Sequence, residues 1–145
     1  KLTAYTVIKF KAYQSHKGQR LPIYHTNVMM SIGDHFVLIC AEAIDDINER
    51  ERVIDSFRYQ SKEIILIYED QLNDFVGNVL QVKSKDNGFF LVMSTRAFQS
   101  LHAQQKVQLE KYGTLLHSDL TTIEMLGGGS ARCMIAEIFL PIKKI

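Results

Sequence analysis

Residues 77–93, GNVLQVKSKDNGFFLVM, predict two antiparallel strands joined by a tight turn at Asp86-Asn87-Gly88. A helix is expected over residues 97–112, where apolar side chains recur at helical spacing and Gly113 follows as a terminator. Residues 114–117 then return to a strand. The expected structural unit is therefore strand, strand, helix, strand.

The preceding part of the chain has the same order of expected elements. Residues 23–30 and 36–40 predict a hairpin, a helix is expected after Asp45-Asp46, and residues 63–68 predict the closing strand. A short helix or turn over residues 69–75 separates the two units. A further strand is expected at the start of the chain, over residues 2–13, ending in a turn at residues 15–18.

The two units align at a period of about 50 residues. Asn27-Val28-Met29 corresponds to Asn78-Val79-Leu80, and Phe36 corresponds to Phe90. An incomplete third unit, expected to open with a strand, places Cys133 where Asn27 and Asn78 stand. Repeats of this kind are typical of propeller-like folds in which equivalent positions converge on one axis. We expect one domain over residues 1–145, with units over about residues 22–72 and 75–120 and a partial unit from about residue 127.

Composition excludes several classes of function. The chain has 145 residues, of which 46% are hydrophobic and 23% charged, with a net charge of +1. It carries no basic run that would neutralise a row of phosphates, so we expect no nucleic-acid partner. Its longest apolar runs are far shorter than the roughly 20 residues of a membrane helix, so we expect no membrane span.

Cysteine content points to a reducing compartment. Cys40 and Cys133 cannot build a disulfide framework, and no signal-peptide pattern opens the chain, so the sequence predicts a cytoplasmic protein. The chain opens on Lys1 followed at once by a strand-like run. We therefore interpret it as part of a longer polypeptide.

Cys133 is the candidate nucleophile. It follows Gly127-Gly128-Gly129, whose backbone can come close to a ligand, and its neighbour Arg132 favours a thiolate. The alternative is a buried structural cysteine after a flexible loop. Cys40 lies inside a continuous apolar run, so we expect it in the core.

His25 is the candidate proton carrier. The repeat places it on the unit next to that of Cys133 and at nearly the same level along the axis, as a thiol and its acid/base partner require. Taken singly, a histidine at a strand end is usually structural or solvent-facing. That interpretation also covers the remaining histidines, which are His16, His35, His102 and His117.

Metal and nucleotide sites are not expected. Histidines and cysteines show none of the close pairs of a zinc site, and no calcium-binding loop is present in the sequence. No Lys-Ser or Lys-Thr follows the glycine triplet, which argues against a phosphate-binding loop.

Three segments resemble a known family. Residues 24–30 (YHTNVMM), 75–80 (FVGNVL) and 127–141 (GGGSARCMIAEIFLP) are similar to the C-terminal half of arginine deiminase-related enzymes, close to the citrulline-utilisation hydrolases. The resemblance implies an α/β fold of the pentein type, an α/β-propeller of five strand-strand-helix-strand units. It also implies that Cys133 is the nucleophile, that His25 is the acid/base histidine and that Arg132 lies at the substrate mouth, with Gly128 and Gly129 beside the substrate.

The chain departs from arginine deiminases in two respects. They carry a carboxylate two residues after the histidine to bind the guanidinium, whereas this chain has the uncharged Asn27. A neutral ureido group, as in citrulline, suits Asn27 better. The other substrate-binding carboxylates of the family belong to its N-terminal half, to which nothing in this sequence corresponds.

The sequence and the resemblance together predict a cysteine-dependent hydrolase acting on the amidino or ureido carbon of arginine-like or citrulline-like compounds, with no cofactor and no metal. An amidinotransferase, or a non-catalytic subunit or fragment acting in assembly, are the alternatives. The expected partners are the small substrate and either the missing N-terminal half of the fold or another copy of the chain.

Overall fold

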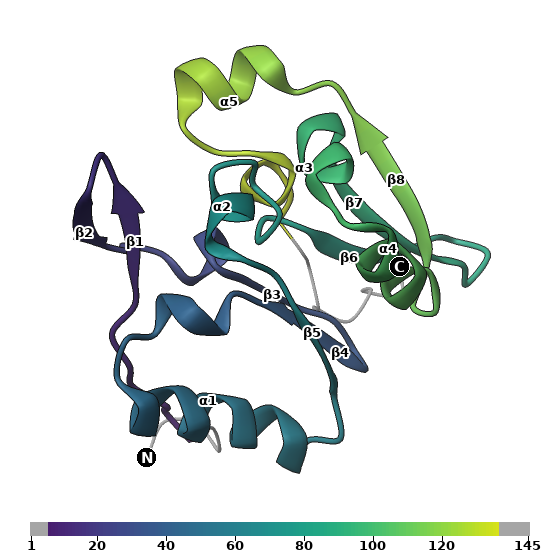
Figure 1. Cartoon of the computed structure of the whole chain (residues 1–145). Helices are drawn as coiled ribbons and strands as arrows, with labels where there is room; N and C mark the ends of the chain where they lie inside the picture. Colours follow the sequence, from purple (N-terminus) through teal and green to yellow (C-terminus); the bar gives the residue numbers. More distant parts are fainter. Residues whose placement is uncertain (1–5, 137–145) are drawn as a thin grey trace, which may run out of the picture.

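Two small three-stranded sheets and a separate hairpin form the framework of the computed structural model (Figure 1), which describes residues 6–136. The strands are β1 (Tyr13–His16), β2 (Gln19–Pro22), β3 (Met30–Ile32), β4 (Phe36–Ile39), β5 (Glu63–Leu66), β6 (Leu80–Lys83), β7 (Phe89–Ser94) and β8 (Thr114–Ser118). The helices are α1 (Ile47–Tyr59), α2 (Glu69–Leu72), α3 (Thr95–Ser100), α4 (Ala103–Glu110) and α5 (Thr121–Gly127), with 3₁₀ turns η1 (Thr26–Val28), η2 (Ala41–Ala43) and η3 (Ala131–Met134).

The two three-stranded sheets have the same topology. In the first, β3 pairs antiparallel with β4, and β4 pairs parallel with β5 after the crossover through α1. In the second, β6 pairs antiparallel with β7, and β7 pairs parallel with β8 after α3 and α4. A parallel pair needs such a crossover because its strands run in the same direction. The expected mixed α/β architecture is confirmed.

Helix α1 forms where the sequence predicts it. The Asp46 carboxylate accepts a hydrogen bond from the backbone N–H of Glu49 at 2.9 Å, which satisfies a donor that the first helical turn would leave unpaired. Val53, Ile54 and Phe57 are buried on one side of the helix, and the charged residues cover the other. In Figure 1, α1 runs along one side of the first sheet.

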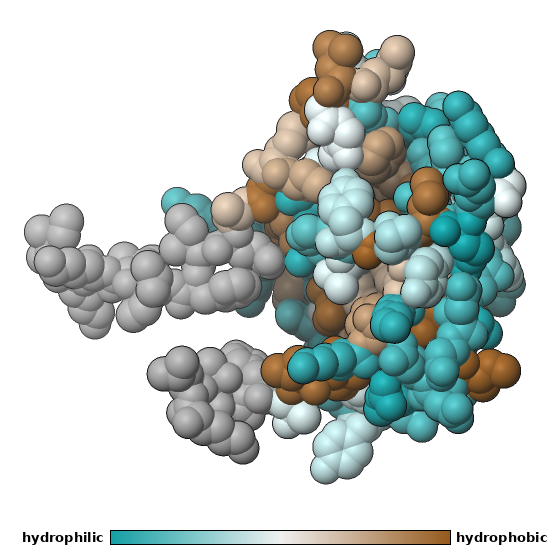
Figure 2. Space-filling view, turned by 90° about the vertical axis from the view of Figure 1, so that its left-hand side faces the viewer, coloured by the Kyte–Doolittle hydropathy of each residue, from teal (hydrophilic) through white to brown (hydrophobic). Residues whose placement is uncertain are grey.

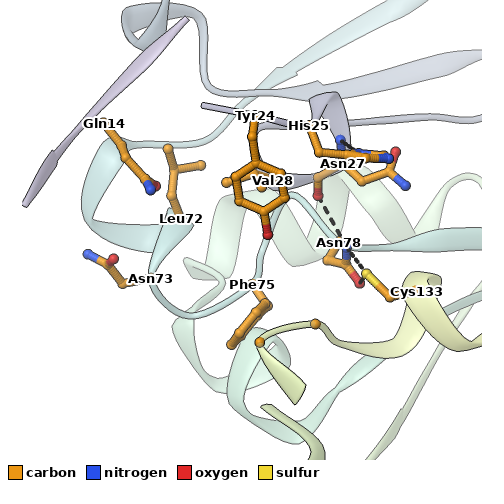
Figure 3. Close-up of a pocket in the computed structure, with 12 residues that line it drawn as sticks. Gln14, Tyr24, His25, Asn27, Val28, Leu72, Asn73, Phe75, Asn78 and Cys133 are labelled. Atoms are coloured by element: carbon orange, nitrogen blue, oxygen red, sulfur yellow. Dashed lines mark hydrogen bonds between the residues drawn. The ribbon is translucent and has the colours of Figure 1, made fainter. Parts of the chain in front are cut away.

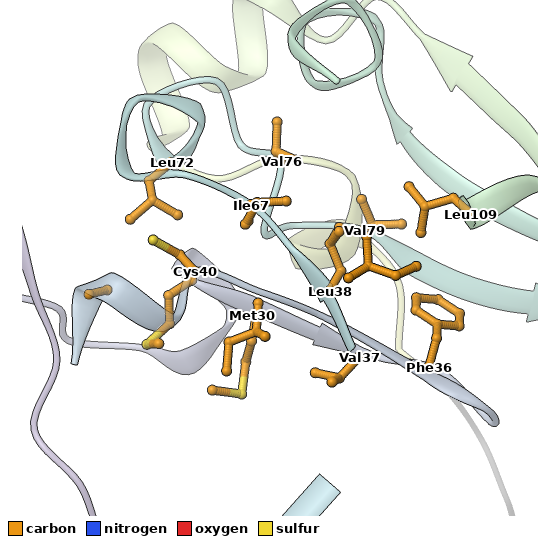
Figure 4. Packing of buried hydrophobic residues seen from close by; sticks show 14 of the residues in the cluster. Met30, Phe36, Val37, Leu38, Cys40, Ile67, Leu72, Val76, Val79 and Leu109 are labelled. Atoms are coloured by element: carbon orange, nitrogen blue, oxygen red, sulfur yellow. The ribbon is translucent and has the colours of Figure 1, made fainter. Parts of the chain in front are cut away.

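The core is continuous across both sheets (Figure 4). All four residues of β4 are fully buried, because β3 and β5 cover its two edges and apolar side chains pack on both faces. Phe36 of β4 stacks on Tyr112, which follows α4, with ring centroids 5.0 Å apart. Cys40 is fully buried in the same core, which confirms the prediction from its apolar surroundings.

A pair of buried glutamines joins the two units. Gln71 of α2 and Gln105 of α4 exchange two side-chain hydrogen bonds, of 2.9 and 3.0 Å. Each also accepts a hydrogen bond from the backbone N–H that precedes its own helix, at Tyr68 and His102 respectively. The two helix N-termini are therefore capped by one shared polar cluster.

Arg20 fastens the β1-β2 hairpin to the first unit. Its guanidinium forms ion pairs with Asp45 and with Glu69, the latter at 2.6 Å. The hydrogen bonds that Arg20 donates to these carboxylates, above all to Asp45, hold the pKa of Arg20 above its usual range. The hairpin carries few buried side chains of its own, so this attachment fixes its place.

The expected strands before residue 30 are wrong in their boundaries. Within residues 6–12 the chain forms no strand, because the backbone groups of Lys9 and Lys11 bond to side chains of α1. Pairing begins only at β1 and β2, which flank the turn at Lys17-Gly18; residues 2–5 lie outside the described residues. The expected strand over residues 23–30 is instead the turn η1, which His25 caps, followed by β3.

Two further expectations need correction after residue 94. The helix expected over residues 97–112 is divided into α3 and α4, since Leu101 is extended and Gln105 caps a new N-terminus. Cys133 does not open a strand but lies in η3, which follows the unexpected helix α5. The apolar run after it falls outside the described residues from residue 137 on. No helix within residues 6–136 has the length and apolarity to cross a membrane.

Gly77 permits the closest approach between the two units. A Cβ atom at this position would lie 2.4 Å from the backbone oxygen of Val28, well inside contact distance. We predict that Gly77→Ala lowers the free energy of unfolding by about 2 kcal/mol, because backbone must shift to relieve the overlap. Urea denaturation of the purified protein measures the change.

Gly127→Ala is the matched control, since its Cβ would meet only a side-chain methyl of Ile123 at 3.9 Å. Alanine is the better helix former, so this variant should be as stable as the parent or more stable. Equal stability of the two variants would contradict the claim that the backbones touch at Gly77.

Candidate active site

A pocket of about 260 Å³ opens between η1, the segment after α2 and the loop before η3 (Figure 3). Its lining residues are Gln14, Tyr24, His25, Asn27, Val28, Leu72, Asn73, Phe75, Asn78, Gly128, Gly129 and Cys133. The pocket therefore gathers side chains from three parts of the chain that are far apart in sequence. Five of the six residues predicted for the site line it.

Cys133 presents an exposed thiol to this pocket. Its backbone N–H donates to the carbonyl of Ser130 at 3.0 Å, the bond that closes the turn η3. Its Sγ atom lies 3.2 Å from Nδ2 and 3.6 Å from Oδ1 of Asn78. The Asn78 amide can thus accept a hydrogen bond from the thiol or donate one to the thiolate.

The Asn78 side chain connects the segments that form the site. Its side chain is 4% exposed, and its Nδ2 also donates to the carbonyl of Asn27 at 3.2 Å while its Oδ1 accepts from the backbone N–H of Arg132 at 3.0 Å. The Arg132 N–H needs an acceptor, which is the oxygen of the Asn78 amide. The Asn27 carbonyl needs a donor, which is the nitrogen of the same amide. These two partners fix the orientation of the amide. Figure 3 shows Asn78 between Asn27 and Cys133.

His25 is exposed and lines the same pocket. Its Nδ1 accepts a hydrogen bond of 3.0 Å from the backbone N–H of Asn27, which caps η1. In the neutral ring the proton is thereby assigned to Nε2. The local sequence His25-Thr26-Asn27 therefore sets both the course of the backbone and the tautomer of the imidazole.

The glycines of the loop stand beside the thiol. Gly128 has a φ of 65°, in the left-handed region that side chains disfavour, and it ends helix α5. A Cβ atom on Gly129 would lie 3.2 Å from Sγ of Cys133. Glycine at this position keeps one side of the sulfur open.

Arg132 is not among the residues that line the described pocket, and its place at the substrate mouth stays a prediction. Its backbone N–H bonds to Asn78, and its Nη1 donates to the carbonyl of Val79 at 3.5 Å. The side chain is therefore directed toward the backbone before β6. Its backbone N–H contributes to the geometry around the thiol by holding the Asn78 amide.

Sequence reasoning missed Asn78 as a site residue, although the repeat alignment contained the signal. Asn27, Asn78 and Cys133 occupy one aligned position, and the structure joins all three through the Asn78 amide. Tyr24 and Phe75 of the pocket wall were missed as well. Phe75 adopts a positive φ of 60°, which no periodicity in the sequence indicates.

Among the described residues no group of three or more His, Cys, Asp or Glu side chains could hold a metal ion. The donors around the pocket are amides, a thiol and an imidazole, so the arrangement is suited to nucleophilic and proton-transfer chemistry.

Comparison with known proteins places the chain in a family. The family model for N,N dimethylarginine dimethylhydrolase, eukaryotic, matches residues 1–140. The chain belongs to the dimethylarginine dimethylhydrolase family. This membership confirms the resemblance to the arginine deiminase-related superfamily. No curated protein sequence matches the chain.

A solved structure shares the fold of this family member. It is the apo crystal structure of ArgZ, an arginine dihydrolase from the ornithine-ammonia cycle in cyanobacteria, with a TM-score of 0.60 and 21% sequence identity. The match covers 84% of this chain and 18% of the ArgZ chain. At this identity the similarity establishes the fold, and the chain spans less than a fifth of that structure's length.

The two cysteines of this family member differ sharply in environment. Burial raises the pKa of the Cys40 thiol to about 12, whereas Cys133 is exposed in the pocket. We predict that iodoacetamide at neutral pH alkylates Cys133 at least about 100-fold faster than Cys40, because only the thiolate of an accessible cysteine reacts.

Peptide mapping by mass spectrometry over a time course gives both rates in one sample. A denatured sample is the control, since the two thiols should then react at similar rates. Preferential labelling of Cys40 in the folded protein would rule out Cys133 as the nucleophile.

Proposed function

We propose that this protein is a hydrolase that acts on the guanidino or ureido group of arginine derivatives through Cys133. The observation that carries the proposal is that Cys133 and His25 line one pocket, with the Asn78 amide against the sulfur. Family membership supports the same class of substrate, since the family is named for hydrolysis of dimethylarginine. ArgZ, which shares the fold, is described as an arginine dihydrolase.

The first half of the reaction forms a covalent intermediate. The Cys133 thiolate attacks the central carbon of the substrate and an S–C bond forms. The tetrahedral adduct then expels an amine or ammonia as the C–N bond breaks, and the imidazolium of His25 gives its proton to the leaving nitrogen. Asn78 Nδ2 donates to the sulfur while it is negatively charged.

The second half regenerates the enzyme. Water attacks the same carbon, His25 takes one of its protons, and the S–C bond breaks to restore the Cys133 thiolate. The net reaction is substrate plus water giving an amine or ammonia and the product in which oxygen replaces that nitrogen. No group besides the side chains named is required for this balance.

Protonation of His25 is coupled to the turn that holds it. The imidazolium carries protons on both nitrogens, so Nδ1 can no longer accept from the N–H of Asn27. That hydrogen bond must open each time His25 becomes charged. The proton transfers are therefore accompanied by a small movement at the start of η1.

Further units of the same fold are expected to complete the substrate pocket, from the same polypeptide or from a second copy. We propose that they close the α/β-propeller and that this chain forms its C-terminal half. Exposed apolar side chains support a covered face here: Met125 and Leu126 of α5 are 74% and 84% exposed, and Leu116 on the edge strand β8 is 51% exposed. Figure 2 shows hydrophobic surface at the top of the molecule, the end at which Figure 1 places α5. The described pocket lining also holds no carboxylate to bind a guanidinium.

Replacement of the two reacting residues tests the mechanism. In the protein completed by the missing units, we predict that Cys133→Ala abolishes turnover of arginine derivatives, and that His25→Ala lowers kcat by at least about 100-fold, the usual loss when acid/base catalysis is removed. Both residues are exposed, and the substitutions remove one cap of η1 and one contact of Asn78, so the free energy of unfolding should fall by no more than about 2 kcal/mol. Steady-state kinetics and urea denaturation provide the two measurements.

His16→Ala is the matched control for His25, because His16 is also exposed and lies outside the pocket lining. This variant should keep the parent kcat. Turnover by the Cys133→Ala protein would exclude the covalent route.

Asn27 is expected to select between guanidino and ureido substrates. A carboxylate forms charge-assisted hydrogen bonds to a guanidinium, and these are roughly twice as strong as neutral ones. We predict that Asn27→Asp shifts the ratio of kcat/KM toward arginine-like and away from citrulline-like compounds by at least about tenfold. Measuring the two substrate series on both proteins gives the ratio.

Asn73→Asp introduces the same charge elsewhere in the pocket lining and serves as the control. It should change the ratio less than Asn27→Asp does. An unchanged or reversed ratio in Asn27→Asp would mean that this side chain does not face the reacting group.

A further inference from the structure

Glu124 of α5 is a buried carboxylate that the proposed chemistry does not use. Its side chain is only 5% exposed, and it does not line the pocket. One oxygen, Oε1, accepts a hydrogen bond of 2.7 Å from the hydroxyl of Ser130. The other, Oε2, is buried without a hydrogen-bond partner among the described residues.

A buried glutamate with one unpaired oxygen does not stabilise the fold. Transfer of a carboxylate from water to a buried place costs free energy, and a single hydrogen bond offsets only part of it. An apolar side chain of similar volume would avoid this cost. A buried polar atom without a partner often marks a role other than stability, and the contacts of Glu124 indicate that role.

Ser130 connects Glu124 to the nucleophile. It is fully buried, its hydroxyl donates to Glu124, and its carbonyl accepts from the N–H of Cys133 at 3.0 Å. A chain of two hydrogen bonds thus runs from α5 through one residue to the backbone that carries the thiol. Figure 1 shows the chain leaving α5 and turning back into the yellow segment that contains η3.

Two glycines, Gly128 and Gly129, separate the end of α5 from Ser130. A Cβ atom on Gly128 would meet nothing within 4 Å. Glycine has the largest conformational freedom of all residues, so such a loop samples many conformations unless something holds it. The Glu124–Ser130 hydrogen bond spans this loop and restricts it.

We propose that Glu124 is a positioning residue for Cys133: through Ser130 it holds the glycine loop so that the thiol keeps its place against Asn78. This inference rests on the proposed function of Cys133. It assigns Glu124 no contact with the substrate, so its removal should affect kcat far more than KM.

The test compares Glu124→Met with Glu124→Gln. Methionine removes the acceptor of the Ser130 hydroxyl, whereas glutamine keeps an oxygen that can occupy the place of Oε1. We expect Glu124→Met to lower kcat by at least about tenfold with KM changed less than about threefold, and to leave the free energy of unfolding unchanged or higher. Glu124→Gln should keep kcat within about threefold of the parent.

Hydrogen exchange gives a readout that needs no substrate. The amide of Cys133 is bonded to Ser130, so loosening the loop should speed its exchange by at least about tenfold in Glu124→Met and in Ser130→Ala. The double variant should exchange the Cys133 amide no faster than either single variant, because both substitutions remove the same hydrogen bond. Glu110→Met, at an exposed glutamate of α4, is the control and should change neither kcat nor exchange.

Three outcomes would overturn the proposal. They are parent-like kcat and exchange in Glu124→Met, a loss in Glu124→Gln as large as in Glu124→Met, and a fall of stability that accounts for the loss of turnover. Absence of any turnover by the parent protein together with the units that complete its fold would refute the proposed function instead. The exchange of the Cys133 amide would then still decide whether Glu124 holds the loop.

Discussion

The side-chain amide of Asn78 makes hydrogen bonds to groups from two distant parts of the chain: the Asn27 carbonyl on one side, and the Arg132 N–H and Cys133 sulfur on the other. Because the amide is buried, losing any of these partners would leave a polar group unpaired. Close packing at Gly77 brings the backbone of Val28 next to Asn78, which fixes the position of the first unit relative to the second. The position of the proposed nucleophile relative to His25 follows from these contacts.

Polar side chains that bond to backbone groups join the two units around this point. Ser31 of β3 donates to the carbonyl of Val79, and Gln81 of β6 accepts from the N–H of Asp34 and donates to the carbonyl of Tyr112. These bonds have directions, unlike the apolar contacts of the shared core, and they set how the two sheets meet. The pocket is therefore a product of the junction rather than of either unit.

Much of the fold could be predicted because its signals are local. The cap at Asp46, the apolar run over residues 36–40 and the turn at Asp86-Asn87-Gly88 gave the helix, the buried strand and the hairpin. The strand boundary near the start of the chain could not be predicted, because side chains of α1 form hydrogen bonds with the backbone groups of Lys9 and Lys11. For the site, the repeat alignment contained Cys133 and Asn78, but the direction of the Arg132 side chain depends on a tertiary contact with Val79.

The reciprocal bonds between Gln71 and Gln105 have a consequence for how the molecule opens. Each amide caps the N-terminus of its own helix and also bonds to the other amide, so fraying of α2 would remove two hydrogen bonds from the buried Gln105 of α4. Partial unfolding of one unit is thus penalised by the other. The two units should behave as a single cooperative foldon, with the protection of their amides lost together rather than one unit at a time.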